Sequence, residues 1–395
     1  MFSYKTKLDS NLRYLLTNNC YRNYRVLIKY KNIKTSIIKK ITSLKGELLY
    51  ELEFSSLICA KISKRLLERL LEYPEVEFIT LDEYLFLCGM SVSTANNTRI
   101  SSKCNLSGKG VGIGIVDSGV YPHSDLLKPT SKINYFKDLI NNLSYPYDDN
   151  GHGTCIAGLI ASSGEKSKGL YRGIAHHASL YCYKAFDALG KGFASDILFA
   201  IEDLINTSSK NNIKILCLPF ELLTHNIFIT KSFDSTFLNA INKGIIPIVP
   251  SGSNLNSSLS ITGIATLSSC ITVGGLDTSK AIKAYDYSSC GKYKNITKPD
   301  LSAAAVNITT LNSDLSYISE KDGVKLYPKK LESYYKSFSG TSLAVGFISA
   351  ICALLFEKKP DLSFKDIYSL LKLSCECPEL DNIGEGYIDI SKLPI

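Results

Sequence analysis

The most constraining feature of the sequence is a regular alternation of short apolar runs with helical patterns from residue 110 onward. The apolar runs read VGIGIVDSG, ASLYCYKAF, IKILCLPF, IIPIVPSGS, CITVGGL and VNITTL. Helical patterns, such as Ser195–Ile205 and the stretch before Lys243, lie between them. Because the runs are apolar throughout, the pattern indicates a parallel sheet that helices cover on both sides. The predicted fold class is therefore α/β, with a doubly wound, mostly parallel sheet.

The N-terminal part of the chain reads as a separate, smaller α/β unit. Its strand patterns are YRVLIKY, ELLYELEF and VEFITLDEYLFL, and its helical patterns lie around Lys34–Leu44 and Ser63–Glu72. From residue 91 to residue 109 the composition shifts to Ser, Asn, Thr and Gly, which is typical of a linker. We therefore predict a small unit over residues 1–90, a linker over residues 91–109 and a large domain over residues 110–395.

Composition and charge argue against two classes of partner. The formal net charge is +8, but the basic residues are spread along the 395-residue chain and rarely alternate with aromatic residues, so no nucleic-acid partner is predicted. No apolar run reaches the roughly 18 residues of a membrane span, so no membrane partner is predicted. The N-terminal run MFSYKTKLDSNLRYLL lacks the apolar core of a secretory signal. We therefore expect a cytoplasmic protein, with release by a non-classical route left open.

The twelve cysteines indicate a reducing compartment rather than a disulfide framework. Most of them lie inside apolar stretches, where a reduced thiol packs as a small hydrophobic side chain. The nearest approach to a metal-binding spacing is Cys375-Glu376-Cys377, which has no second pair of cysteines and no histidines around it. We predict no metal site and no cofactor.

Three short motifs place a reactive side chain beside glycine at the end of a strand or the start of a helix. Asp117 ends an apolar strand in Val-Asp-Ser-Gly, His152 begins an apolar helical run in Asn-Gly-His-Gly-Thr, and Ser342 begins another in Ser-Gly-Thr-Ser-Leu-Ala. A hydroxyl nucleophile needs a base within hydrogen-bond reach, and that base needs a third group that fixes its tautomer. The three motifs supply these groups in the order Asp, His, Ser, which is the order found in subtilisin.

The motifs resemble those of the subtilase family, and segments between them are similar too. Further matches are HSDL after the aspartate, GIAHHASLYCYKAF after the histidine helix, KPDLSAAAVNI before the serine and GEGYIDI near the end. The resemblance implies a serine endopeptidase that cleaves protein or peptide substrates with Asp117, His152 and Ser342. Residues 45–90 resemble the family's inhibitory pro-segment, which implies a self-processing zymogen that is inhibited by its own pro-segment and cleaved between about Leu85 and Ala95.

The resemblance also assigns residues to the cleft, and some of them depart from the family pattern. The family's oxyanion asparagine aligns with Ser253, and Asn254 follows it. Losing that donor costs on the order of 10² to 10³ in rate, a figure measured on a subtilisin. Pro219 has no amide to donate, and Phe220 is expected to bring bulk where relatives have glycine, so recognition should be narrow. The residues assigned to substrate binding are Gly190, Lys191, Gly192, Leu218, Pro219, Phe220, Ser251 and Gly252.

Two questions stay open from the sequence. Many subtilases bind calcium in the loop after the histidine helix, but SSGEKSKGLYRG has few suitable oxygen ligands, so a calcium site is not predicted. The departures at Ser253 and at residues 218–220 support alternative functions, namely a pseudoprotease that keeps the cleft for binding, or a maturation protease with narrow specificity. Labelling by a fluorophosphonate separates an enzyme from a pseudoprotease, because it requires an activated serine.

Overall fold

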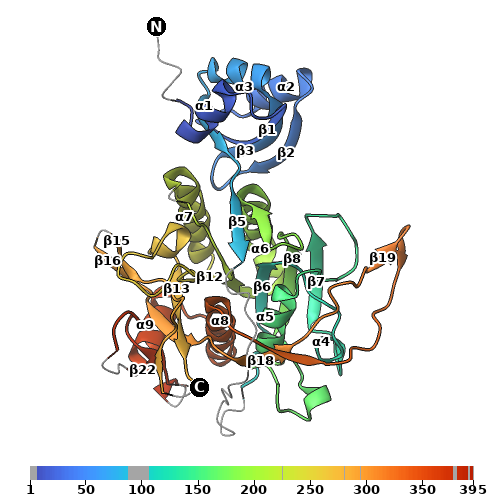
Figure 1. Ribbon diagram of the computed structural model, residues 1–395, viewed down its shortest axis with the longest axis vertical. Helices are drawn as coiled ribbons and strands as arrows, with labels where there is room; N and C mark the ends of the chain where they lie inside the picture. The colour runs from blue at the N-terminus through green and yellow to red at the C-terminus, as the bar shows by residue number, and fades with distance from the viewer. Residues whose placement is uncertain are drawn as a thin grey trace.

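The computed structural model describes residues 7–87, 106–224, 226–279, 281–293, 295–376, 380–389 and 392–394, with the backbone alone for residues 84–87. The chain forms a small N-terminal unit (residues 7–81) that sits on a larger C-terminal unit (from residue 106), as Figure 1 shows. One strand, β5 (Tyr84–Leu87), runs from the first unit into the second. Most of the predicted linker, and the boundary at residue 90, fall outside the described residues, so both stay predictions.

The C-terminal unit is built on a mostly parallel sheet, as the apolar runs predict. Within the described residues the sheet has ten strands, and its main path is β22-β23-β17-β13-β12-β10-β6-β8-β7. The strands from β23 to β7 are parallel, whereas the edge strand β22 and the strand β14, which pairs with β13, are antiparallel. In path order the strands are Cys375–Glu376, Tyr387–Ile388, Leu301–Ala304, Ile271–Asp277, Ile246–Pro250, Ile213–Cys217, Gly112–Asp117, Ser179–Lys184 and Ile133–Asp138, with β14 at Lys283–Ala284.

Helices cover both faces of this sheet, so the predicted doubly wound α/β fold is confirmed. On one face α5 (His152–Ala161) packs against α8 (Thr341–Lys358), and on the other α6 (Ala194–Asn211) lies beside α7 (Ile227–Asn242). By length and composition α8 could cross a membrane, but 89% of it is buried inside the protein. It is therefore the core helix of this layered fold.

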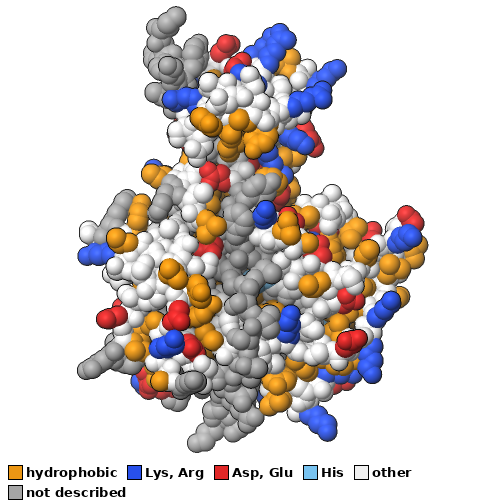
Figure 2. Space-filling view, in the orientation of Figure 1, with side chains coloured by type: hydrophobic (Ala, Val, Ile, Leu, Met, Phe, Trp, Pro, Cys, Tyr) orange, Lys and Arg blue, Asp and Glu red, His pale blue; other side chains and the backbone are white. Residues whose placement is uncertain are grey.

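The N-terminal unit is a four-stranded antiparallel sheet with helices on its outer face. The strand order is β2 (Glu47–Leu52), β3 (Leu57–Ser63), β1 (Asn23–Tyr30) and β4 (Val76–Leu81), and the helices are α1 (Ser10–Thr17), α2 (Thr35–Ser43) and α3 (Lys64–Leu71). These helices share one apolar core with the sheet. The opposite sheet face, with Leu27, Leu52 and Leu57, joins the core of α6 and α7. Figure 2 shows the unit seated on the larger one, with Lys and Arg side chains dispersed over the visible face.

Details of the sequence-based description differ from the structure. The VNITTL pattern forms β18 (Ile308–Leu311), which pairs with β21 (Tyr335–Phe338) outside the main sheet, and β17 takes the expected place in the main sheet. The VEFITLDEYLFL pattern is not one strand, because β4 ends before Asp82 and β5 begins after Glu83. The sequence does not predict β7, because it lies at the sheet edge with half-exposed side chains instead of an apolar run.

Candidate active site

Asp117 lies at the carboxyl end of β6, in the interior of the large sheet. Its side chain is fully buried, and its carbonyl oxygen accepts hydrogen bonds from the amides of Ala185 and Phe186 at 2.9 and 3.3 Å. The carboxylate oxygen Oδ1 accepts the amide of Ser118 at 2.6 Å. Sheet and loop amides thus fix both the backbone and the carboxylate at the edge where open α/β folds place their sites.

His152 is the first residue of α5, and its ring faces Asp117. The Nδ1 atom lies 2.9 Å from each carboxylate oxygen, and the imidazole is almost completely buried. This contact favours the tautomer with hydrogen on Nδ1, in which Nε2 is the acceptor. A methyl group on Gly153 would lie 2.1 Å from the carbonyl oxygen of Gly119, so a glycine after the histidine allows α5 to approach β6 this closely.

Asp148 holds the loop that carries the histidine. Its carboxylate accepts hydrogen bonds from the Ser118 hydroxyl at 2.8 Å, the Gly151 amide at 2.8 Å and both the amide and the hydroxyl of Thr154. The Ser118 hydroxyl in turn accepts the amide of Gly153 at 3.0 Å. Because Asp148 is fully buried and bonded on both oxygens, it ties the end of β6 to the start of α5.

Ser342 is the second residue of α8 and lies among buried side chains. Its hydroxyl donates a hydrogen bond to the carbonyl oxygen of Pro219 at 3.1 Å. The first amides of a helix lack helical partners and favour negative charge, so this position suits a nucleophile next to a developing oxyanion. At Gly346, an added methyl group would lie 3.5 Å from Ile156 of α5, so the two helices pack closely and start at the same edge of the sheet.

The predicted oxyanion residues lie in the loop after β12. The amide of Ser253 donates to Oε2 of Glu221 at 3.0 Å, and its hydroxyl donates to Oε1 of the same carboxylate. The amide of Asn254 donates to the Ser289 hydroxyl at 2.8 Å, and the residue is exposed. The loop is therefore fixed by Glu221 on one side and by Ser289 on the other.

The predicted substrate-binding strands lie on either side of β5. Strand β9 (Lys191–Phe193) and strand β11 (Phe220–Glu221) both pair with β5 in antiparallel fashion, in the order β11-β5-β9. Gly190 makes the turn before β9 with φ of 75°, and a methyl group on Gly192 would lie 2.3 Å from the carbonyl oxygen of Ala185. The cleft thus binds an extended segment of its own chain by strand addition on both edges.

The expectation that Phe220 brings bulk into the cleft is wrong. Its side chain is fully buried and packs against the rings of Phe186 and Phe233, with ring centroids 5.4 and 6.3 Å apart. Leu218 is also fully buried, and its amide donates to the carbonyl oxygen of Ile248 at 3.0 Å. Both large side chains fill the core beneath the cleft, so they do not obstruct the backbone of β11, which pairs with β5.

A cluster of charged side chains joins the two units next to the cleft. Asp82, at the end of the N-terminal unit, accepts the amide of Ser195 at 2.8 Å, and thereby binds the N-terminus of α6. Arg25 of β1 donates to Asp82 and to Asp196, each at 2.6 Å, and to the Ser195 hydroxyl at 2.6 Å. The Asp82 side chain is fully buried, so this is a desolvated ion-pair network between the units.

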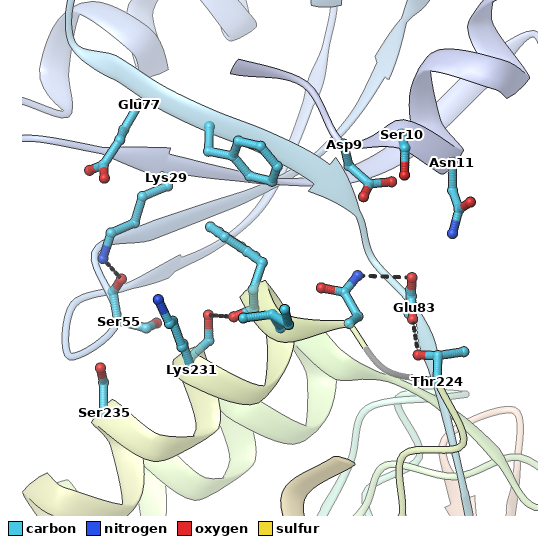
Figure 3. A pocket seen from close by; sticks show the side chains of 15 residues that line it. Asp9, Ser10, Asn11, Lys29, Ser55, Glu77, Glu83, Thr224, Lys231 and Ser235 are labelled. Atoms are coloured by element: carbon cyan, nitrogen blue, oxygen red, sulfur yellow. Dashed lines mark hydrogen bonds between the residues drawn. The ribbon is translucent and has the colours of Figure 1, made fainter. Parts of the chain in front are cut away.

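A second contact lies at the N-terminus of α7, shown in Figure 3. The carboxylate of Glu83 accepts hydrogen bonds from Asn226 at 2.9 Å and from Thr224 at 2.5 Å. Next to it, a cavity of about 910 Å³ opens between the N-terminal unit and α7, with Lys29 on one wall and Lys231 on the other. None of the three candidate catalytic residues lines this cavity, so it belongs to the contact between the units.

Three residues of the site have no signal in the sequence analysis. Asp148 stands in an Asp-Asp pair of a polar loop, and Glu221 stands in an apolar run. Lys184, at the end of β8, is fully buried and donates to the carbonyl oxygen of Ser118 at 2.7 Å and to Asp149 at 2.5 Å. Charged residues at strand ends or within apolar runs are the one signal that could have identified them.

The thiols near the site are buried and unlinked. The cysteines in the described residues are free, and burial raises the pKa of the Cys155 and Cys182 thiols, so both stay protonated near neutral pH. Within the part of the chain that the structure describes, no three His, Cys, Asp or Glu side chains gather in a way that could hold a metal ion.

Comparison with known families agrees with this geometry. The model of the subtilase family matches residues 108–384. The chain belongs to the subtilase family. The matched range holds all the candidate catalytic and cleft residues, and it begins after the N-terminal unit and β5.

Curated relatives include proteases of Bacillus. The chain is 34% identical to serine protease AprX of Bacillus subtilis over 278 residues, which is 68% of this chain and 61% of AprX. It is 30% identical to the minor extracellular protease Epr of the same organism over 65% of this chain and 34% of Epr. It is 26% identical to subtilisin DY of Bacillus licheniformis over 71% of this chain and 87% of that protein. The match thus spans less than two thirds of AprX and of Epr.

A solved structure shares the fold over most of the chain. The structure of fervidolysin from Fervidobacterium pennivorans, described as a keratinolytic enzyme related to subtilisin, matches with a TM-score of 0.71 and 17% identity. The match covers 94% of this chain and 61% of fervidolysin, so the likeness of fold extends beyond the range that the family model matches.

Proposed function

We propose that this protein is a serine endopeptidase in which Ser342 is the nucleophile, His152 the general base and Asp117 the group that orients the histidine. The observation that carries the proposal is the 2.9 Å contact of His152 Nδ1 with both Asp117 oxygens, at the edge of the sheet where α8 begins and Ser342 is its second residue. Membership of the subtilase family supports the same reaction.

Each residue has a defined step in this reaction. His152 takes the proton of the Ser342 hydroxyl on Nε2 while the oxygen attacks the peptide carbonyl, and Asp117 stabilises the imidazolium that forms. Amides in the first turn of α8 stabilise the negative charge on the former carbonyl oxygen. His152 then gives its proton to the leaving amine, and water attacks the acyl-enzyme by the same route in reverse. Two measurements test the assignment, namely labelling of Ser342 by a fluorophosphonate and, in a separate sample, cleavage of a peptide that the labelling abolishes.

We further propose that the N-terminal unit is an inhibitory pro-segment. Strand β5 occupies the position between β9 and β11 where a substrate strand would pair, so the cleft is blocked while the unit is bound. Asp82 and Glu83, directly before β5, bond to the starts of α6 and α7 and so fix the entry of β5 into the cleft. Dissociation of the unit would remove these contacts and β5 together.

The contact with the N-terminal unit should weaken as the pH rises through about 7, because burial raises the pKa of Glu202 on α6 to about 7. The carboxylate lies under the turn between β2 and β3, where backbone amides of Glu53, Phe54 and Ser55 offset part of the effect of burial. Once the unit leaves, Glu202 is exposed and its pKa returns to about 4.3. The complex thus favours protonated Glu202, and the contribution of this residue to the affinity is full below about pH 4.3 and is lost as the pH rises to about 7.

Size-exclusion chromatography of the processed complex at pH 5 and at pH 8 measures this effect, because it reads retention of the N-terminal unit without depending on activity. Glu202→Gln is the matched control, since it cannot titrate and should remove the difference between the two pH values. Equal retention of the unit by the unaltered protein at both pH values would contradict the prediction.

Ser253→Ala should lower kcat on a peptide substrate by no more than about tenfold, because the single hydroxyl hydrogen of Ser253 is donated to Glu221. Asn254→Ala should carry the larger loss, since Asn254 directly follows Ser253 and its longer side chain offers an amide donor. Steady-state kinetics of both variants decides between them. If both variants match the parent, no side chain of this loop serves the oxyanion, and the amides of α8 act alone.

A further inference from the structure

Two stretches of chain flank the nucleophile. On one side the Ser342 hydroxyl donates to the carbonyl oxygen of Pro219 at 3.1 Å. On the other, the hydroxyl of Thr341 donates to the carbonyl oxygen of Gly252 at 3.3 Å. We call residues 219–221 the first wall and residues 251–253 the second wall. A substrate residue whose carbonyl reaches Ser342 therefore has its side chain between these two walls.

The pairing of β5 gives the register of a bound strand. Phe86 pairs with Glu221 and Leu87 with Phe220, so the strand runs along the first wall towards Pro219. In a substrate that keeps this register, one residue pairs with Phe220 as Leu87 does. The carbonyl group that reaches Ser342 belongs to the first or second residue after it. The side chain at that point is the one that precedes the bond to be cleaved.

Glu221 spans the space between the walls. Its side chain leaves the first wall, and its two oxygens accept the amide and the hydroxyl of Ser253 on the second wall, the amide at 3.0 Å. A methyl group on Gly252 would lie only 2.7 Å from Oε2 of Glu221 and 3.1 Å from the Ser289 hydroxyl. Glu221 is 6% exposed, so its side chain fills this space and is held in one position by its hydrogen bonds.

We propose that Glu221 closes the pocket for the residue before the scissile bond, so that the enzyme cleaves after glycine or alanine and excludes larger side chains. The inference rests on the proposed function of Ser342 as nucleophile and adds the substrate class. The Glu221 carboxylate, whose two oxygens both accept hydrogen bonds from Ser253, occupies the pocket between the two walls. A substrate side chain larger than that of alanine would have to displace it. Two residues beyond Leu87 the sequence has Gly89, which such a site accepts in self-processing.

The test uses the mature enzyme and peptides that differ only in the residue before the scissile bond, namely Gly, Ala, Phe or Lys. For the unaltered enzyme we expect kcat/KM for the Phe peptide to be at least about tenfold below that for the Gly peptide. Glu221→Ala should raise the ratio of kcat/KM for the Phe peptide to kcat/KM for the Gly peptide by at least about tenfold, because it opens the pocket. Glu221→Gln keeps the volume and loses the charge, so it should leave the ratio within about threefold.

Other outcomes overturn the proposal in distinguishable ways. Fastest cleavage of the Lys peptide, lost in Glu221→Gln, would mean that Glu221 recognises charge and does not close the pocket. Equal ratios in the unaltered enzyme and Glu221→Ala would mean that Glu221 does not limit size. Titration of active sites with a fluorophosphonate gives the concentration of active enzyme, and so corrects kcat/KM for any misfolded protein in a variant preparation. Absence of labelling at Ser342 in the unaltered enzyme would remove the proposed function and this inference with it, whereas labelling with an unchanged ratio would remove the inference alone.

Discussion

Replacing Ser342 by alanine should lower peptide hydrolysis by about 10⁶-fold, the order of loss that the corresponding change causes in a subtilisin. The reason is that in the proposed mechanism the hydroxyl oxygen at the start of α8 forms the covalent intermediate, and alanine leaves the buried His152 and Asp117 without this oxygen to activate. The same variant should remain a full-length precursor, because self-processing of the proposed pro-segment would depend on the same serine.

Electrophoresis and N-terminal sequencing measure the second effect. The unaltered chain should acquire a new N-terminus between about Leu85 and Ala95, at or beyond the strand β5 that fills the cleft. Ser349→Ala is a matched control, because it makes the same chemical change at another position of α8. The hydroxyl of Ser349 is also buried. Processing of Ser342→Ala by itself would count against the proposed triad.

Periodicity predicts the layers of this fold better than it predicts their edges. Central strands such as β6 and β12 are buried on both faces and read as continuous apolar runs. The edge strand β7 has exposed side chains, and β17 is four residues long, so neither gives an apolar run that stands out from a loop. At the start of α9 (Phe364–Leu373), Ser363 and Asp366 form a capping box, a local signal that a sequence can show because local hydrogen bonds set a helix end.

The candidate site shows the same division between local and distant signals. Asp117, His152 and Ser342 each carry a local mark, a glycine-rich turn at a strand or helix end, so the sequence identifies them. The hydrogen bond between Ser253 and Glu221 joins residues 32 positions apart, so no local sequence pattern predicts it. The position of Phe220 was misjudged for a related reason, because the direction of a side chain in a two-residue strand depends on packing against Phe186 and Phe233.

The second large effect concerns the contact that holds the N-terminal unit in place. Asp82→Asn should weaken binding of the processed unit by about 10²-fold, which corresponds to about 3 kcal/mol. Asp82 is fully buried, receives the Ser195 amide at 2.8 Å and pairs with Arg25 at 2.6 Å. Asparagine keeps the size and can still accept one hydrogen bond, but it removes the negative charge at the positive end of α6 and takes one of the two carboxylates away from Arg25, which keeps its ion pair with Asp196.

A dilution series of the processed complex measures the change, because peptidase activity is recovered as the unit dissociates. Glu68→Gln is the matched control, since Glu68 is an exposed carboxylate on α3, on the face of the unit that points away from the C-terminal unit. We expect half of the activity of Asp82→Asn to appear at about 10²-fold higher protein concentration than in the control. Superimposable dilution curves for the two variants would mean that inhibition rests on strand pairing by β5, and that the ion-pair network contributes no net affinity because its desolvation cost offsets its attraction.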